Sequence, residues 1–225
     1  MSRLFNGSSY IDCGNVTQLV SAKAFTLAFR CFKNTSADGV IITKGSDGAR
    51  LLCEWWTDST WYLYINSSTT TVIDRSLGWQ WYAMTFDASL ASGSRARFYR
   101  GTTLLATWCT ASTVNSTTGS LFIGRDPIGG GFNNTSGTQF SHVQLYNRPL
   151  DRGSGNDLFN LMSDPLDRPS GCVGHWCQGP LNGVIEPDAM QNWTGRWTGT
   201  PQYGTSTPPN TFNRARGPRY GNRVA

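Results

Sequence analysis

Apolar and polar residues alternate in short segments from the N-terminus to about residue 150. In FTLAFRCF, residues 25–32, the side chains of Phe25, Leu27, Phe29 and Cys31 share one side of an extended chain. This period of two is typical of a strand with one buried face. Alternation or a short apolar run also predicts strands at 39–45, 61–65, 79–87, 120–126 and 142–146, and a hairpin at 96–108. Loops rich in Gly, Ser, Asn and Asp separate these segments, so the pattern predicts an all-β, two-sheet antiparallel jelly-roll sandwich.

The pattern changes after Pro149. Eight of the 10 prolines lie from Pro165 onward, and proline excludes central strands. We therefore predict a sandwich over residues 1–164 and an extended C-terminal arm with little regular structure over 165–225. The arm nevertheless carries aromatic residues, which leaves two alternatives: a disordered linker, or an ordered arm docked on a partner. These aromatics are Trp176, Trp193, Trp197, Tyr203, Phe212 and Tyr220.

Charge and hydropathy bear on two classes of partner, nucleic acids and membranes, and the positive charge alone would allow nucleic-acid binding. The net charge is +5 and 16 of the 19 basic residues are Arg, because only three are Lys. No basic cluster interleaves with aromatics on a short strand, so no nucleic-acid partner is expected. No run of about 18 apolar residues occurs, so no membrane span is expected. The N-terminus lacks the basic start and apolar stretch of a secretory signal, which leads us to expect synthesis in the cytoplasm.

Six segments in a fixed order carry a family resemblance: LFNGSSYIDCGN, FTLAFRCF, VIITKGSDG, WYAMTFDASLASGSRARFYRGTTLLA, LFIGRD and HVQLYNRPL. Over residues 3–162, the series resembles the laminin-G-like branch of the concanavalin A-like lectin and glucanase jelly rolls. The resemblance implies that the first and last strands pair, with HVQLYNRPL as the closing strand and DLFNLM as a short helix after it. Members of this superfamily bind glycans, proteins or Ca²⁺, and some hydrolyse polysaccharides. Fold alone does not choose among these activities.

The acidic residues do not form the pair that glycoside hydrolysis requires. The nearest candidates are Glu54 and Asp58, whose spacing is wider than the E-x-D arrangement of the hydrolytic relatives. Phe140-Ser141-His142 stands where the calcium-binding relatives often have acidic residues. We therefore expect neither an enzyme nor a cofactor, and no metal site.

Aromatic and polar residues in the middle of the domain are candidates for glycan binding. Aromatic rings stack on the apolar faces of sugars, and Trp55, Trp56 and Tyr62 cluster in sequence, while Asn133 lies in a Gly-rich loop. The alternative is that these rings belong to the core, since half of the side chains on a strand point inward.

Two cysteines at the start of the arm are the candidates for a covalent link. In CVGHWC, Cys172 and Cys177 flank His175. A zinc site would require a second closely spaced pair of ligands in the sequence. A local disulfide between Cys172 and Cys177 is the preferred interpretation in an oxidising compartment.

Two functional hypotheses follow. The first is a non-enzymatic structural protein on the surface of a tailed-phage virion, either a capsid decoration (cement) protein or a fibre-associated subunit. Its C-terminal arm would bind neighbouring capsid or other virion subunits, and the protein could form a homo-oligomer such as a trimer. The arm contacts would come from Trp193, Trp197, Arg214, Arg216 and Arg219. The second is a lectin-like carbohydrate-binding module, secreted or on a cell surface; a virion protein could also bind host or mucus glycans.

Overall fold

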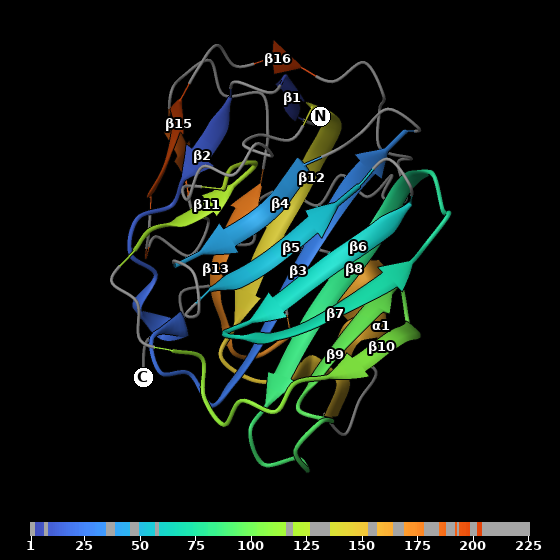
Figure 1. Ribbon diagram of the computed structural model, residues 1–225. Coiled ribbons are helices and arrows are strands. Elements are labelled where there is room, and N and C mark those ends of the chain that lie inside the picture. The colour runs from blue at the N-terminus through green and yellow to red at the C-terminus, as the bar shows by residue number, and fades with distance from the viewer. Residues whose placement is uncertain are drawn as a thin grey trace.

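The computed structural model describes residues 3–6, 9–34, 39–45, 50–56, 59–115, 119–126, 136–152, 157–163, 169–177, 185–187, 192, 194–198 and 202–203. Within these residues the chain forms two antiparallel sheets packed face to face (Figure 1), which confirms the predicted all-β sandwich.

The first sheet, sheet A, contains the longest strands. Its order is β10-β9-β8-β3-β12-β1-β16, and β13 pairs with β12 along the same edge as β1. The bounds are β1 Arg3–Asn6, β3 Ala24–Lys33, β8 Gly78–Asp87, β9 Ala96–Arg100, β10 Thr103–Trp108, β12 Ser136–Tyr146, β13 Cys172–Cys177 and β16 Gln202–Tyr203. Arg3 lies opposite Phe140, so the first strand pairs with the strand that contains HVQLY, as the resemblance implies.

The second sheet, sheet B, has the order β14-β15-β2-β11-β4-β5-β6-β7. The bounds are β2 Tyr10–Asp12, β4 Gly39–Lys44, β5 Leu51–Trp55, β6 Thr60–Ile65, β7 Ser68–Ile73, β11 Leu121–Ile123, β14 Ile185–Pro187 and β15 Thr194–Thr198. A 3₁₀ turn, η1, spans Thr17–Leu19 between β2 and β3. In Figure 1, β4 to β7 lie in front of the long strands of sheet A.

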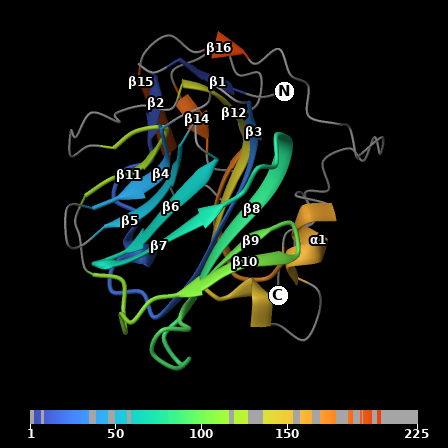
Figure 2. The same cartoon turned by 45° about the vertical axis from the view of Figure 1, so that its right-hand side comes forward.

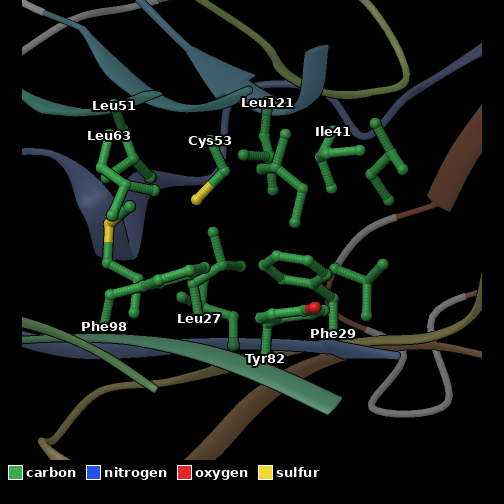
Figure 3. Close-up of a cluster of buried hydrophobic side chains, with 14 of the residues drawn as sticks. Leu27, Phe29, Ile41, Leu51, Cys53, Leu63, Tyr82, Phe98 and Leu121 are labelled. Atoms are coloured by element: carbon green, nitrogen blue, oxygen red, sulfur yellow. The ribbon is translucent and has the colours of Figure 1, made fainter. Parts of the chain in front are cut away.

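The main core fills the space between the two sheets. On β3, Phe25, Leu27, Phe29 and Cys31 are each at most 1% exposed, which confirms the inward face read from the sequence. In Figure 3, side chains such as Leu27 and Phe29 from sheet A point toward Leu51, Cys53 and Leu63 from sheet B. Full burial of one such Leu or Phe contributes roughly 1.5–3 kcal/mol.

A short helix covers part of the outer face of sheet A. Helix α1, Asp157–Ser163, follows the 3₁₀ turn η2, Leu150–Arg152, and matches the predicted DLFNLM segment. Leu158 and Leu161 of α1 belong to a second apolar cluster with Tyr99 and Tyr146. Figure 2 shows α1 beside sheet A, on the side away from β4 to β7.

The C-terminal segment differs from the predicted arm. β13 continues sheet A along β12, β14 and β15 extend sheet B beyond β2, and β16 pairs with β1. Trp176 of β13 is 0% exposed within the main core. Proline is enriched in this segment, yet the strands fall between the prolines or at the sheet edge, where a missing N–H costs little.

A pair of oppositely charged side chains, Lys33 and Asp74, is buried. The Lys33 ammonium lies 3.2 Å from Asp74 Oδ2, and both side chains are 0% exposed. Lys33 Nζ also lies 3.5 Å from the centroid of a Trp55 ring and 5.0 Å from that of Trp61. Burial by itself raises the pKa of Asp74, but the hydrogen bond from Tyr82, the Lys33 charge and hydrogen bonds from Ser76 outweigh it and hold that pKa well below its usual range.

Candidate functional site

Three aromatic side chains form a row on the outer face of sheet B. Trp56 directly follows β5, while Tyr62 and Tyr64 alternate with core residues along β6. The Trp56 and Tyr62 rings lie 4.7 Å apart between centroids and are inclined by 37°. All three side chains are half-buried. This aromatic row, Trp56, Tyr62 and Tyr64, is therefore held on a rigid pair of strands and faces away from the core.

Hydroxyl side chains flank the aromatic row on β7, which is the edge strand of sheet B. Thr71 lies opposite Tyr62 and Thr69 lies opposite Tyr64, and both threonines are exposed. Ile73, two residues further on the same face, is 69% exposed. The edge thus offers hydroxyl groups and an apolar contact next to the rings.

Charged groups border the other side of the row. The Arg50 guanidinium lies 4.6 Å from the Tyr64 ring centroid, and its Nη1 donates to Asp126 Oδ2 at 3.2 Å. Glu54 lies opposite Tyr62 on β5 and is 7% exposed. The ion pair fixes Arg50 over the ring, so donors and acceptors with defined directions lie beside the aromatic faces.

Two of the predicted glycan-binding residues meet at this row, and one does not. Trp56 and Tyr62 are brought together. Trp55 is 1% exposed and packs in the core, 5.1 Å from Trp61 between ring centroids. The prediction that Trp55 contacts a glycan is therefore wrong. Adjacent residues on a strand point to opposite faces, which is why Trp55 and Trp56 separate. Asn133 lies outside the described residues.

The covalent link proposed for the arm does not fit the structure. Cys172 and Cys177 are the first and last residues of β13. At about 3.3 Å per residue their Cα atoms lie about 16 Å apart, whereas a disulfide requires less than about 7 Å. The prediction of a Cys172–Cys177 disulfide is therefore wrong.

The arm contacts are only partly described. Trp197 lies on β15, opposite Ile11 of β2. Trp193, Arg214, Arg216 and Arg219 lie outside the described residues.

A second group of polar and aromatic side chains, which was not predicted to meet from the sequence, lies on the outer face of sheet A. Trp81 stacks on His142 at 5.9 Å between ring centroids, and His142 Nδ1 lies 3.2 Å from His175 Nε2. Burial and the nearby Arg30 charge lower the pKa of His142 to about 4. The sequence signal that could have indicated this group was the spacing of Trp79 and Trp81, but WQWYAMTFD was interpreted as a buried central strand.

Clustered metal ligands and membrane-spanning helices are both absent from the described residues. In the described parts of the chain, no three or more His, Cys, Asp and Glu side chains form a group that could hold a metal ion. None of the helices in those parts has the length and apolar character needed to cross a membrane.

No family model and no curated protein sequence matches the chain, but solved structures share its fold. A protein of Bacteroides ovatus, provisionally described as carbohydrate binding, has a TM-score of 0.69 and 17% identity over 91% of this chain and 60% of its own. The heptameric SAP-like pentraxin of Limulus polyphemus has a TM-score of 0.54 and 18% identity, over 75% of this chain and 84% of its own. Domains LG4-5 of the mouse laminin α1 chain give 0.51 and 10%, over 66% and 42%. At such identities the comparisons show the fold alone, and this chain has a lectin-like jelly-roll fold.

Proposed function

We propose that this protein is a carbohydrate-binding module whose site is the aromatic row on the outer face of sheet B. The observation that carries the proposal is the pair of half-buried rings, Trp56 and Tyr62, held 4.7 Å apart on an outward face. A pyranose ring has an apolar face of C–H bonds and a rim of hydroxyl groups. The rings suit that face, and the row lies between polar groups on both sides that suit the rim.

The polar groups suit neutral or mixed sugars. Thr69 and Thr71 offer hydroxyls on one side, and Glu54 and the Arg50–Asp126 pair offer acceptors and donors on the other. The description of the Bacteroides ovatus protein as carbohydrate binding agrees with this reading. We expect millimolar to micromolar affinity, because a few stacked rings and hydrogen bonds contribute on the order of 4–8 kcal/mol.

The proposed activity is binding without hydrolysis. Hydrolysis needs two carboxyl groups about 5–9.5 Å apart across the scissile bond. Asp58, the sequence partner of Glu54, lies outside the described residues, and Asp126 is engaged by Arg50. The described residues of the row thus offer rings and hydrogen-bonding groups for recognition.

A glycan array followed by calorimetry on the best ligand tests the proposal. Replacing Tyr62 with Ala should weaken binding by about 10-fold or more, since stacking on one aromatic ring is worth about 1–3 kcal/mol in other ring ligands. Tyr10→Ala is the matched control, because Tyr10 lies on β2 of the same sheet, four strands and about 19 Å from β6. No bound glycan on the array, or equal affinity for the Tyr62 and Tyr10 variants, would refute the proposal.

The structure gives less support to the hypothesis of a role in virion assembly. Part of its motivation was a long arm available to neighbouring subunits. The described strands of that segment, β13 to β16, instead pair with one another and with strands of the same chain. The glycan-binding hypothesis is therefore the one that the described residues support.

A further inference from the structure

Arg30 is a buried cation on the outer face of sheet A, and it is 9% exposed. In the part of the chain that the structure describes, it makes no ion pair and donates no hydrogen bond, and its guanidinium lies 5.7 Å from the centroid of a Trp79 ring. Burial lowers the pKa of the guanidinium, and no carboxylate of those residues raises it. The face of a ring attracts the charge but leaves five N–H donors to be satisfied. Arginine is rarely buried to this extent without a partner, because an unpaired buried charge costs free energy.

The strand register surrounds Arg30 with rings. Arg30 on β3 lies opposite Trp81 of β8 and opposite His142 of β12. The Trp81 and His142 rings stack at 5.9 Å between centroids, although β3 runs between their strands (Figure 1), so both rings lean over β3. One pair further along, Trp79 lies opposite Phe32, with ring centroids 5.8 Å apart. The Arg30 side chain therefore lies among aromatic groups that three neighbouring strands hold in place.

This group of side chains is open on one side. Trp79 and Phe32 are half-buried, so part of each ring reaches solvent beside the guanidinium. Helix α1 packs further along the same face, in the apolar cluster that contains Ala28 and Ala83. Trp79 thus offers a ring surface next to a cation, on the two central strands β3 and β8.

The charge at this point favours a ligand with a single negative charge. The pKa of His142 is lowered to about 4 by burial and by the Arg30 charge, so this imidazole is neutral at pH 7. Arg97, which lies on β9 of the same sheet, is held by Asp151 Oδ2 at 2.7 Å. Arg30 is then the cation available here among the described residues. One guanidinium matches one carboxylate through two parallel hydrogen bonds, whereas a phosphate dianion would need further positive charge.

We propose that Arg30 and Trp79 form a second binding site, which takes the carboxylate of an acidic sugar such as a uronic acid. The guanidinium pairs with the carboxylate, and the C–H face of the sugar ring stacks on the indole of Trp79. A uronic acid presents both groups on one rigid ring, whereas an acidic peptide side chain carries a carboxylate without a ring face beside it. This site lies on the opposite side of the sandwich from the aromatic row and does not depend on it.

The test compares methyl β-glucuronide with methyl β-glucoside as ligands of the full-length protein. These two sugars differ only in a carboxylate that replaces a hydroxymethyl group, and NMR titrations measure each Kd. We expect the glucuronide to bind at least about 10-fold more tightly, because a charge-assisted pair replaces a neutral hydrogen bond. R30M should remove this preference. R30K keeps the charge without the planar fork, so it should reduce the preference.

Lys23→Gln is the matched control, because it also removes one positive charge from the chain. Lys23 is exposed and precedes Arg30 by seven positions, which is about 23 Å along an extended strand. K23Q should therefore keep the preference for the glucuronide. Thermal melts check that the variants are folded, and R30M should melt no more than about 2 °C below the parent protein, since it removes an unpaired buried charge.

Four outcomes would overturn the proposal. The first is a glucuronide that binds no more tightly than the glucoside, and the second is an R30M variant that keeps the preference. The third is equal binding of glucose 6-sulfate or of acetate, which would show that the site does not select a carboxylate on a sugar ring. The fourth is loss of the preference in Y62A instead of R30M. The acidic sugar would then be bound at the aromatic row, so the proposed function would stand without the second site.

Discussion

Replacing Trp176 with Ala tests whether the segment after residue 164 is part of the fold. The indole is 0% exposed and packs in the core between the sheets. A buried Trp→Ala substitution removes the contacts of the ring and leaves a cavity, which typically costs about 3–5 kcal/mol. A domain has roughly 5–15 kcal/mol of stability in total, so the loss is a large share of it.

For a chain of this size, about 1 kcal/mol lowers Tm by about 2–4 °C, so W176A should melt about 6–20 °C below the parent protein. Calorimetry or circular dichroism at constant pH measures this. Leu104→Ala is the control, because Leu104 is 49% exposed on β10 and should change Tm by about 2 °C or less. If W176A and L104A melt at the same temperature, Trp176 is not in the core and residues 165–225 form a dispensable appendage. A chain ending at residue 164 should then also be stable, whereas our structure predicts that it loses β13 and unfolds more readily.

Three further predictions concern stability and the edge of the site. The pKa of Asp74 is lower in the folded than in the unfolded protein, so its contribution to stability is present above about pH 4 and is lost as the pH falls below that. D74N should therefore flatten the acid limb of a Tm–pH curve and lower the free energy of unfolding at pH 7 by about 3–5 kcal/mol. An unchanged acid limb would contradict the buried pair. Gly124 and Gly93 both have positive φ (+83° and +86°), but a Cβ on Gly124 would lie 2.3 Å from the Phe5 ring, whereas one on Gly93 would meet nothing within 4 Å. Urea denaturation should therefore show G124A to be less stable than G93A by about 1–3 kcal/mol. Ile73→Ser on the exposed end of β7 should leave Tm within about 2 °C and weaken glycan binding about 2–5-fold if the edge of β7 takes part, and identical calorimetric titrations would exclude that edge from the site.

The strands with regular alternation could be predicted from the sequence because their periodicity reports one buried face. β3 is the best case: its four inward residues are those read from FTLAFRCF. Strands β5 and β7 were not predicted as strands. β5 is buried along its whole length, and Val72 is the one buried residue of β7, so neither sequence shows a clean alternation of apolar and polar residues. Their neighbours in the sheet determine them, which is tertiary information.

The C-terminal strands were missed for a different reason. The proline content after Pro165 was interpreted as evidence against regular structure, although proline excludes only the residue that must donate an N–H. CVGHWC contains no proline, yet Gly174 interrupts its pattern, and Trp176 was counted with an arm that was either disordered or docked on a partner. Pairing with β12 provides the hydrogen bonds and the core contact that local composition could not reveal.

The candidate site shows how much depends on register. The sequence selected Trp55 and Trp56 together, but a shift of one residue along a strand moves a side chain from one face to the other. Only the pairing of β5 with β6 decides that Trp56 lies with Tyr62 on the outer face and that Trp55 stacks near Lys33 in the core. The same argument applies to His142 and His175: they lie on different strands 33 positions apart, and their contact follows from the pairing of β12 with β13. A residue's chemistry can thus be read from the sequence, whereas the partner that gives it a function is set by long-range strand register.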